Sequence, residues 1–200
     1  MSDQHKYGFI TLLESKLLDD LLLQLKSDFG EIRFIEIGVF TGETLRGIYQ
    51  RAKEIDCPVH CEGVDWEMYK PSGVPEDYVF HAGDSMDAWR NVSGNFNLLF
   101  VDGCHCINHS MNDFLNYSPF VDVGGYALFH DSAPNANGEQ GEWPQDHSYA
   151  GQPPSVLGVR SGLQKMGILQ GHRRDWELVR EIQEGDLMGM SLFRKLLPLL

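Results

Sequence analysis

The sequence predicts an α/β protein in which helices cover both faces of a mainly parallel sheet. Three observations lead to this prediction. Short apolar runs alternate with helical patterns through the first two thirds of the chain. A glycine turn separates the run at residues 34–37 from the helical pattern that follows it, and two further strand-like segments lie close together near the C-terminus. The expected architecture is a Rossmann-like three-layer sandwich, with five parallel strands finished by an antiparallel C-terminal hairpin.

Residues 8–28 are expected to form an amphipathic helix. Its leucines recur every four residues, while acidic and basic residues occupy the other positions. Such a helix covers a sheet or a partner subunit. We therefore assign residues 1–30 to an N-terminal helical cover within a single domain that spans residues 1–200.

The central unit is a strand, a glycine turn and a helix. Residues 34–37 form the strand, and a helical pattern runs over residues 45–55. Between them, Gly38 permits a sharp turn and a close ligand, and the amides of the next helix N-terminus favour negative charge. Glu36 at the strand end would repel a pyrophosphate but attract an ammonium group, which suits an amino-acid-bearing nucleoside. The rest of the turn contributes Phe40, Thr41 and Gly42.

The second and third strands are each followed by an acidic residue. Residues 59–64 lead into Asp65 and Trp66, and residues 78–83 lead into Asp84. A carboxylate at the end of strand two accepts hydrogen bonds from both ribose hydroxyls in nucleoside-binding sheets. Trp66 offers a flat face for a base. Asp65 as a turn cap is the alternative.

Strands four and five, at residues 97–101 and 126–129, also end in polar residues. A helix at residues 107–120 connects them, and Gly124-Gly125 is expected to end that connection. Because parallel strands place their carboxyl ends at one edge of the sheet, a ligand site is expected there. The polar residues of this edge are Asp102, His105, His130 and Asp131.

The last third begins with a long loop at residues 132–154, rich in Gly, Pro, Asn and Gln. Loops of this length in a compact domain are usually functional lids or disordered segments, and we expect a lid. A helix near residues 155–169 follows. Strands at residues 176–182 and 187–193 then form the antiparallel hairpin.

Composition narrows the classes of partner. The chain has 42% hydrophobic residues and a formal net charge of −13 over 200 residues. This acidity disfavours nucleic acid and anionic membranes as main partners, because both require basic patches. The first residues lack a secretory signal pattern, so we expect a cytoplasmic protein. The leucine-rich first helix is suited to a homodimer.

The four cysteines occur as C-x-x-x-C at residues 57–61 and C-x-C at residues 104–106. Neither spacing matches an established structural zinc pattern. We therefore expect reduced thiols that act as small core residues, with a fortuitous metal site as the lesser alternative.

The acid-x-Gly-x-x-x-Gly turn, the acids after strands two and three, and the Asp102-Gly103-x-His105 segment together resemble class I S-adenosylmethionine-dependent methyltransferases. Within that class, residues 31–132 resemble small O-methyltransferases related to macrocin O-methyltransferase and cephalosporin hydroxylase. The resemblance implies the strand order 3-2-1-4-5-7-6. It also implies methyl transfer to a hydroxyl of a small molecule such as a sugar or natural product.

The resemblance further implies roles for particular residues. Asp84 would contact the adenine amino group, Met86 would pack on the adenine ring, and Ser85 lies beside them; Asp84 or Ser85 as a helix cap is the alternative. The expected cofactor-binding residues are Glu36, Gly38, Phe40, Thr41, Gly42, Asp65, Trp66, Asp84, Ser85, Met86 and Asp102.

A divalent cation, Mg²⁺ or Mn²⁺, would be held by Asp102, His130 and Asp131. His130 stands where many family members have an acid, which leaves the identity and the presence of the cation open. Without a metal, His105 or His130 must remove the proton from the acceptor hydroxyl. The expected catalytic residues are therefore His105, His130 and Asp102.

Two other functional classes remain open. One is a nicotinamide-dependent oxidoreductase on a similar sheet, disfavoured because the G-x-G-x-x-G spacing is absent. The other is a nucleoside-binding module without catalysis.

Overall fold

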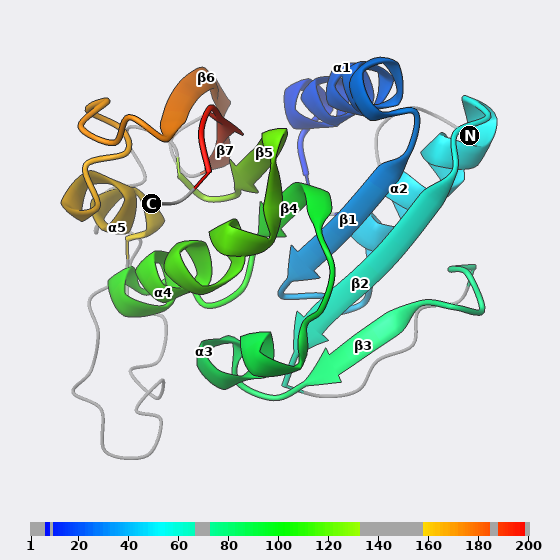
Figure 1. Cartoon of the computed structure of the whole chain (residues 1–200), viewed down its shortest axis with the longest axis horizontal. Helices are drawn as coiled ribbons and strands as arrows, with labels where there is room; N and C mark the ends of the chain where they lie inside the picture. Colours follow the sequence, from blue (N-terminus) through cyan, green and yellow to red (C-terminus); the bar gives the residue numbers. More distant parts are fainter. Residues whose placement is uncertain (1–6, 9, 67–72, 133–157, 185–187, 199–200) are drawn as a thin grey trace.

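The computed structural model describes residues 7–8, 10–66, 73–132, 158–184 and 188–198 (Figure 1). The described strands are β1 (Ile32–Ile37), β2 (Val59–Asp65), β3 (Val79–Ala82), β4 (Phe96–Val101), β5 (Val121–Phe129), β6 (Trp176–Glu184) and β7 (Met188–Lys195). They form one sheet in the order β3-β2-β1-β4-β5-β7-β6. The first five strands pair in parallel, and β7 is antiparallel to both β5 and β6. The predicted fold class and strand order are confirmed.

Helices cover both faces of this sheet, as expected for a three-layer sandwich (Figure 1). The described helices are α1 (Leu12–Phe29), α2 (Glu43–Glu54), α3 (Ser85–Ala88), α4 (Ile107–Tyr117) and α5 (Val159–Lys165), with 3₁₀ turns at Trp89–Asn91 and Ser118–Phe120. One core cluster joins α1 and α2 to Phe34 and Phe100. The other joins α4 and α5 to Ile35 and Leu99. Alternate residues of each central strand therefore serve opposite cores, which explains their continuous apolar runs.

The N-terminal helix begins at Leu12, later than expected, because Thr11 forms its cap. The Thr11 side chain accepts from the Glu14 amide, while the Glu14 carboxylate accepts from the Thr11 amide at 2.7 Å. This reciprocal capping box satisfies two amides that otherwise lack a partner at a helix start. Gly30 ends the helix in the left-handed conformation.

The prediction for the start of the fifth strand was wrong. Gly124 and Gly125 do not end the connection from α4, because β5 already begins at Val121 and contains both glycines. The pairing between β4 and β5 shifts register within this part of the strand, and Gly124 has φ of 87°. Glycine allows the irregular backbone that the shift requires. The helix before β5 also ends early, at Tyr117, and a 3₁₀ turn that contains a proline replaces its last residues.

The C-terminal third agrees with the prediction where it is described. The expected lid at residues 132–154 lies outside the described residues apart from Ser132, and so do the first residues of the helix expected near 155–169. The described part of that helix is α5, which ends at Lys165 and not near residue 169 as expected. The hairpin β6–β7 runs longer than expected at both strands. Treatment of residues 1–200 as one domain stays a prediction. Among the described helices, none combines the length and apolar character needed to cross a membrane.

Candidate active site

Gly38 brings the turn after β1 against the end of β4. Its φ is 90°, and a methyl group in place of its hydrogen would lie 2.2 Å from the Asp102 carbonyl oxygen. The Gly38 amide donates to the Val64 carbonyl at 2.9 Å, and the Asp102 amide donates to the Ile37 carbonyl at 2.8 Å. The ends of three neighbouring strands are thus joined at one point. Only glycine fits this conformation and this approach.

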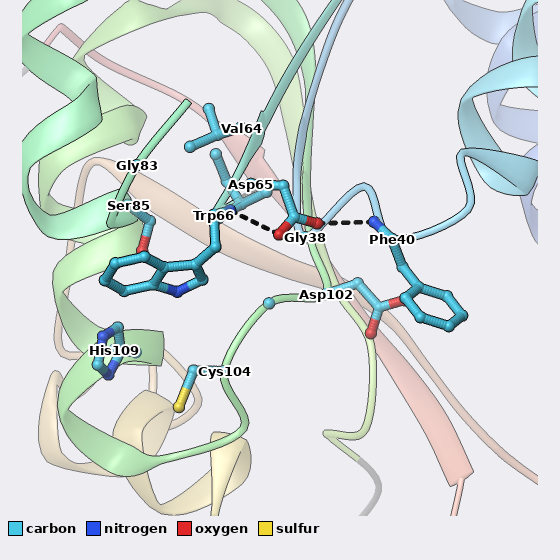
Figure 2. A pocket seen from close by; sticks show the side chains of 12 residues that line it. Gly38, Phe40, Val64, Asp65, Trp66, Gly83, Ser85, Asp102, Cys104 and His109 are labelled. Atoms are coloured by element: carbon cyan, nitrogen blue, oxygen red, sulfur yellow. Dashed lines mark hydrogen bonds between the residues drawn. The ribbon is translucent and has the colours of Figure 1, made fainter. Parts of the chain in front are cut away.

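Asp65, at the end of β2, organises the same turn (Figure 2). One carboxylate oxygen accepts from the Phe40 amide at 2.7 Å, and the other accepts from the Trp66 amide at 2.6 Å. A carboxylate oxygen can accept two hydrogen bonds, so each retains capacity for a ligand hydroxyl. The capping role and the predicted ribose role of Asp65 are therefore compatible.

A cavity of about 240 Å³ opens beside Asp65. Its walls come from the carboxyl ends of β1, β2 and β4, the start of α3 and the first turn of α4. The residues that line it are Ile37, Gly38, Phe40, Val64, Asp65, Trp66, Gly83, Ser85, Asp102, Gly103, Cys104 and His109. Figure 2 shows the Trp66 ring over this space, with Asp65 on one side and His109 and Cys104 below.

Several predicted cofactor residues lie near the cavity without lining it. Asp84 caps α3 by accepting from the Met86 amide at 2.9 Å, as its alternative role required. Asp84 and Met86 are not among the lining residues, whereas Ser85 is. Gly42 adopts φ of 71° at the N-terminus of α2, with Thr41 before it. Adenine contacts by Asp84 and Met86 stay predictions.

Glu36 is almost completely buried, with 1% of its surface exposed. Burial raises the pKa of its carboxyl well above the ordinary value, and the charges of Asp102 and Asp65 raise it further. Hydrogen bonds from Thr44 and the Leu45 amide in the first turn of α2 oppose that rise. A cationic group near this turn would relieve the remaining cost of the negative charge.

A second group of polar side chains gathers at the ends of β4 and β5. We call it the acid–histidine cluster; its members are Asp102, His105, His130 and Asp131. Nδ1 of His130 lies 3.1 Å from Oδ1 of Asp102 and 3.1 Å from Oδ2 of Asp131. Nε2 of His105 lies 3.1 Å from the same Asp131 oxygen and 3.6 Å from Oδ1 of Asp102. The structure therefore brings together all four residues that the sequence placed at this edge.

The charges in this cluster stabilise one another. Burial by itself lowers the pKa of His130, but Asp102, Asp131 and Glu14 raise it well above the ordinary value. Burial opposes ionisation of Asp102 in the same way, but His130 and His105 lower its pKa. For His105 as well, Asp102 and Asp131 outweigh burial and raise the pKa. The carboxylates of the cluster therefore stabilise positive charge on the two histidines.

Two residues that carry a side chain adopt positive φ in this region. Phe40 has φ of 46° in the turn after β1, and Asp131 has φ of 51° directly after His130. Such conformations cost about 1–3 kcal/mol and persist where the surroundings enforce them. For Asp131 this backbone directs the carboxylate to both histidines.

Comparisons with known proteins agree with this geometry. Residues 35–132 match the model of a family described as a methyltransferase domain. The O-methyltransferase TomG from Streptomyces achromogenes, involved in tomaymycin synthesis and solved with SAM, is 17% identical, with a TM-score of 0.64 over 91% of this chain and 80% of that chain. The protein has the class I methyltransferase fold. No curated protein matches the chain in sequence.

Two further solved structures, MycE and NodS, share this methyltransferase fold. MycE of the mycinamycin pathway, solved with Mg and SAH, is 18% identical with a TM-score of 0.59. The match covers 96% of this chain and 51% of MycE, so the chain spans about half of that protein. The N-methyltransferase NodS from Bradyrhizobium japonicum is 15% identical with a TM-score of 0.56, over 90% of this chain and 96% of NodS. The resemblance inferred from the sequence is confirmed. Because one fold serves oxygen and nitrogen acceptors, the acceptor must be argued from the site.

Sequence reasoning missed Glu14, which lies against the acid–histidine cluster, and six residues that line the cavity: Ile37, Val64, Gly83, Gly103, Cys104 and His109. Glu14 of α1 is fully buried, and its Oε2 lies 3.7 Å from Nε2 of His130. The T-x-x-E capping pattern was a visible signal at residues 11–14, but it predicts only a helix start. No local pattern reports that this carboxylate reaches a strand end 116 positions later.

The donor set fits a divalent cation. Asp102, His105 and Asp131 offer ligand atoms that all lie within 4.8 Å of one another. His105 therefore joins this compact group, whereas His130 lies buried behind it against both carboxylates. Two carboxylates and an imidazole suit Mn²⁺, Fe²⁺ or Zn²⁺ as well as Mg²⁺. The field that raises the pKa of both histidines also attracts a cation. The predicted ligand role of His130 stays a prediction.

Proposed function

We propose that the protein is an S-adenosylmethionine-dependent methyltransferase that acts on a hydroxyl group of a small molecule, such as a sugar or natural product. The observation that carries this proposal is that the cavity beside Asp65 adjoins the acid–histidine cluster. Asp102 belongs to both, because it lines the cavity and contacts His130. A cofactor site and a proton-accepting site therefore share one wall.

The residues divide into binding and proton-handling groups. Asp65 would hold the ribose hydroxyls, Trp66 would cover the base, and Gly38 would let the cofactor approach the backbone. Bound S-adenosylmethionine would supply an electrophilic methyl group for in-line transfer. The chain then has to hold the acceptor in line and accept its proton.

His105 is the strongest candidate for the general base. Its side chain is 33% exposed, whereas that of His130 is 5% exposed, so His105 can reach an acceptor. Asp102 and Asp131 raise the pKa of His105, so the ring becomes neutral, and able to accept a proton, only at a pH above the ordinary histidine range. His130 and Asp102 would orient His105 and balance its charge. As the alternative, a cation held by Asp102, His105 and Asp131 would lower the pKa of a nearby hydroxyl, and His105 would then be a ligand and not the base.

The first test is calorimetric titration with S-adenosylhomocysteine, with and without Mg²⁺ or Mn²⁺. We expect micromolar binding, about −8 kcal/mol. Asp65→Asn removes the charge that accepts hydroxyl donors, so we expect affinity to fall by roughly tenfold to a hundredfold. Asp87→Asn is the matched control, because Asp87 lies in the neighbouring helix α3 with 75% of its side chain exposed. Equal effects of the two substitutions, or no binding by the unaltered chain, would refute the proposal.

The second test measures methyl transfer to a panel of sugar and natural-product hydroxyl compounds by mass spectrometry. We expect turnover that Asp102→Asn abolishes. Cofactor binding without turnover across the panel would instead support a non-catalytic nucleoside-binding module.

A further inference from the structure

A second group of side chains that could bind a metal ion lies in the loop after β4 and the first turn of α4. We call it the thiol–imidazole cluster; it consists of Cys104, Cys106 and His109. Their sulfur and ring-nitrogen atoms all lie within 4.8 Å of one another. Figure 2 shows Cys104 and His109 on the α4 side of the cavity, away from the Asp102 carboxylate. The cluster shares no residue with the acid–histidine cluster.

Two of the three candidate ligand atoms, those of Cys106 and His109, are already in contact. Nδ1 of His109 lies 2.9 Å from Sγ of Cys106, and that sulfur also accepts from the His109 amide at 3.3 Å. Ligand atoms around tetrahedral zinc lie roughly 3.6–3.8 Å apart, given Zn–S of about 2.3 Å and Zn–N of about 2.0 Å. The Cys106 sulfur and the His109 Nδ1 therefore need to separate by less than about 1 Å to admit an ion between them.

The other ring nitrogen of His109 lies near a carboxylate, as is usual for metal-bound histidines. Nε2 lies 3.4 Å from Oδ1 of Asp84. A carboxylate on the far nitrogen fixes the ring and increases the basicity of the nitrogen that binds the metal. Asp84 is itself held in place as the cap of α3. This arrangement turns Nδ1 toward the sulfur atoms.

One buried acidic group near the cluster, Asp113, favours a cation there. Asp113, one helical turn after His109, is fully buried, and a methyl group on Gly103 would lie 3.8 Å from its Oδ2. Burial raises the pKa of Asp113 to about 7. A bound divalent cation reverses such shifts and deprotonates a coordinating thiol.

We propose that Cys104, Cys106 and His109 bind a thiophilic divalent cation, with zinc as the expected ion. Two thiolates and one imidazole select zinc over magnesium or calcium. Because Cys104 and His109 line the cavity, an ion held between them would be open to it. Three protein ligands with one open position are typical of a zinc site that takes a water or an exogenous ligand. This site does not depend on the proposed methyl transfer.

The test is a titration of the reduced, chelator-treated full chain with Co²⁺ as the probe. We expect one ion per chain with a thiolate-to-cobalt charge-transfer band that zinc abolishes. Cys106→Ser and His109→Asn should each weaken binding at least about tenfold. Cys57→Ser is the matched control, because Cys57 is also buried but packs in the core on the α1 and α2 face.

Two further measurements keep the proposal falsifiable. If Cys106→Ser does not fold, Cys104→Ser serves instead, because Cys104 is half-buried in a loop. In the unaltered chain, zinc should slow alkylation of Cys104 and Cys106, followed by mass spectrometry of peptides, and leave Cys57 unaffected. Cobalt bound only at the acid–histidine cluster would give no thiolate band and would be lost with Asp102→Asn. That result, or a band that survives in both cysteine variants, would overturn the proposal.

Discussion

Gly38→Ala is the substitution for which the structure predicts the largest effect from a single methyl group. The new Cβ would lie 2.2 Å from the Asp102 carbonyl oxygen and 2.6 Å from Gly103 Cα, and both are backbone atoms that cannot rotate away. The left-handed conformation costs an alanine about 1–2 kcal/mol, and overpacking typically adds 1–3 kcal/mol. Separating the strands also strains the hydrogen bonds made by the Gly38 and Asp102 amides, at about 1 kcal/mol each. We expect a loss of about 4 kcal/mol or more in the free energy of unfolding.

Gly94→Ala provides the matched control for this measurement. Gly94 has φ of 92°, nearly the same as Gly38, but nothing lies within 4 Å of the position its Cβ would take. Its loss should be the conformational cost alone, about 1–2 kcal/mol. Urea denaturation followed by circular dichroism measures both variants. If the two substitutions destabilise the protein equally, close contact with β4 is not the reason for glycine at position 38.

Three further predictions test the packing and the charges of the fold. Leu22→Ala should lower the free energy of unfolding in urea by about 2–5 kcal/mol, because Leu22 is fully buried. Leu23→Ala, at the 46% exposed neighbour, should lower it by less than about 0.5 kcal/mol. Similar losses would contradict the assigned face of α1. Thr11→Ala removes half of the capping box and should cost about 1 kcal/mol, a prediction that an unchanged urea midpoint would contradict. Burial raises the pKa of Glu62, but its two histidine partners lower that pKa overall. The ionised carboxylate should therefore stabilise the fold at a pH above its ordinary pKa of 4.5, and this stabilisation should be lost as pH falls through the pKa in the folded state. Glu62→Gln should accordingly destabilise the protein more at neutral than at acidic pH, and a loss independent of pH would refute the assignment.

The central strands β1 and β4 were predictable because they are buried on both faces. Residues 34–37 and 97–101 read as continuous apolar runs for that reason, and their carboxyl ends had to share one edge of a parallel sheet. The glycine pair at 124–125 failed as a boundary because glycine marks both ends of elements and irregularities within them. Only the pairing partner, β4, distinguishes the two cases.

The site was predictable only in the residues that follow strands. Asp65, Asp102, His130 and Asp131 are located by topology, since each lies at the carboxyl end of a strand or within two residues of it. His105 as a partner of Asp131 depends on how the loop after β4 folds. The fold of the same loop also brings Cys104 and Cys106 together with His109 from the first turn of α4, while His105 between them joins the other group. The C-x-C spacing alone did not predict this arrangement. Spacing rules do not anticipate ligands collected across a loop and a helix.

Glu14 changes the interpretation of the N-terminal helix from a cover to a part of the site. A carboxylate with no exposed surface would ordinarily be protonated, and burial does raise its pKa, but His130 lowers it overall. His130 is in turn held positive by Glu14 together with Asp102 and Asp131. Each buried charge therefore depends on the others, and removal of one leaves an uncompensated charge in the interior. Because Glu14 also caps α1, the start of that helix, the charge on His130 and the position of Asp102 beside the cavity form one coupled unit.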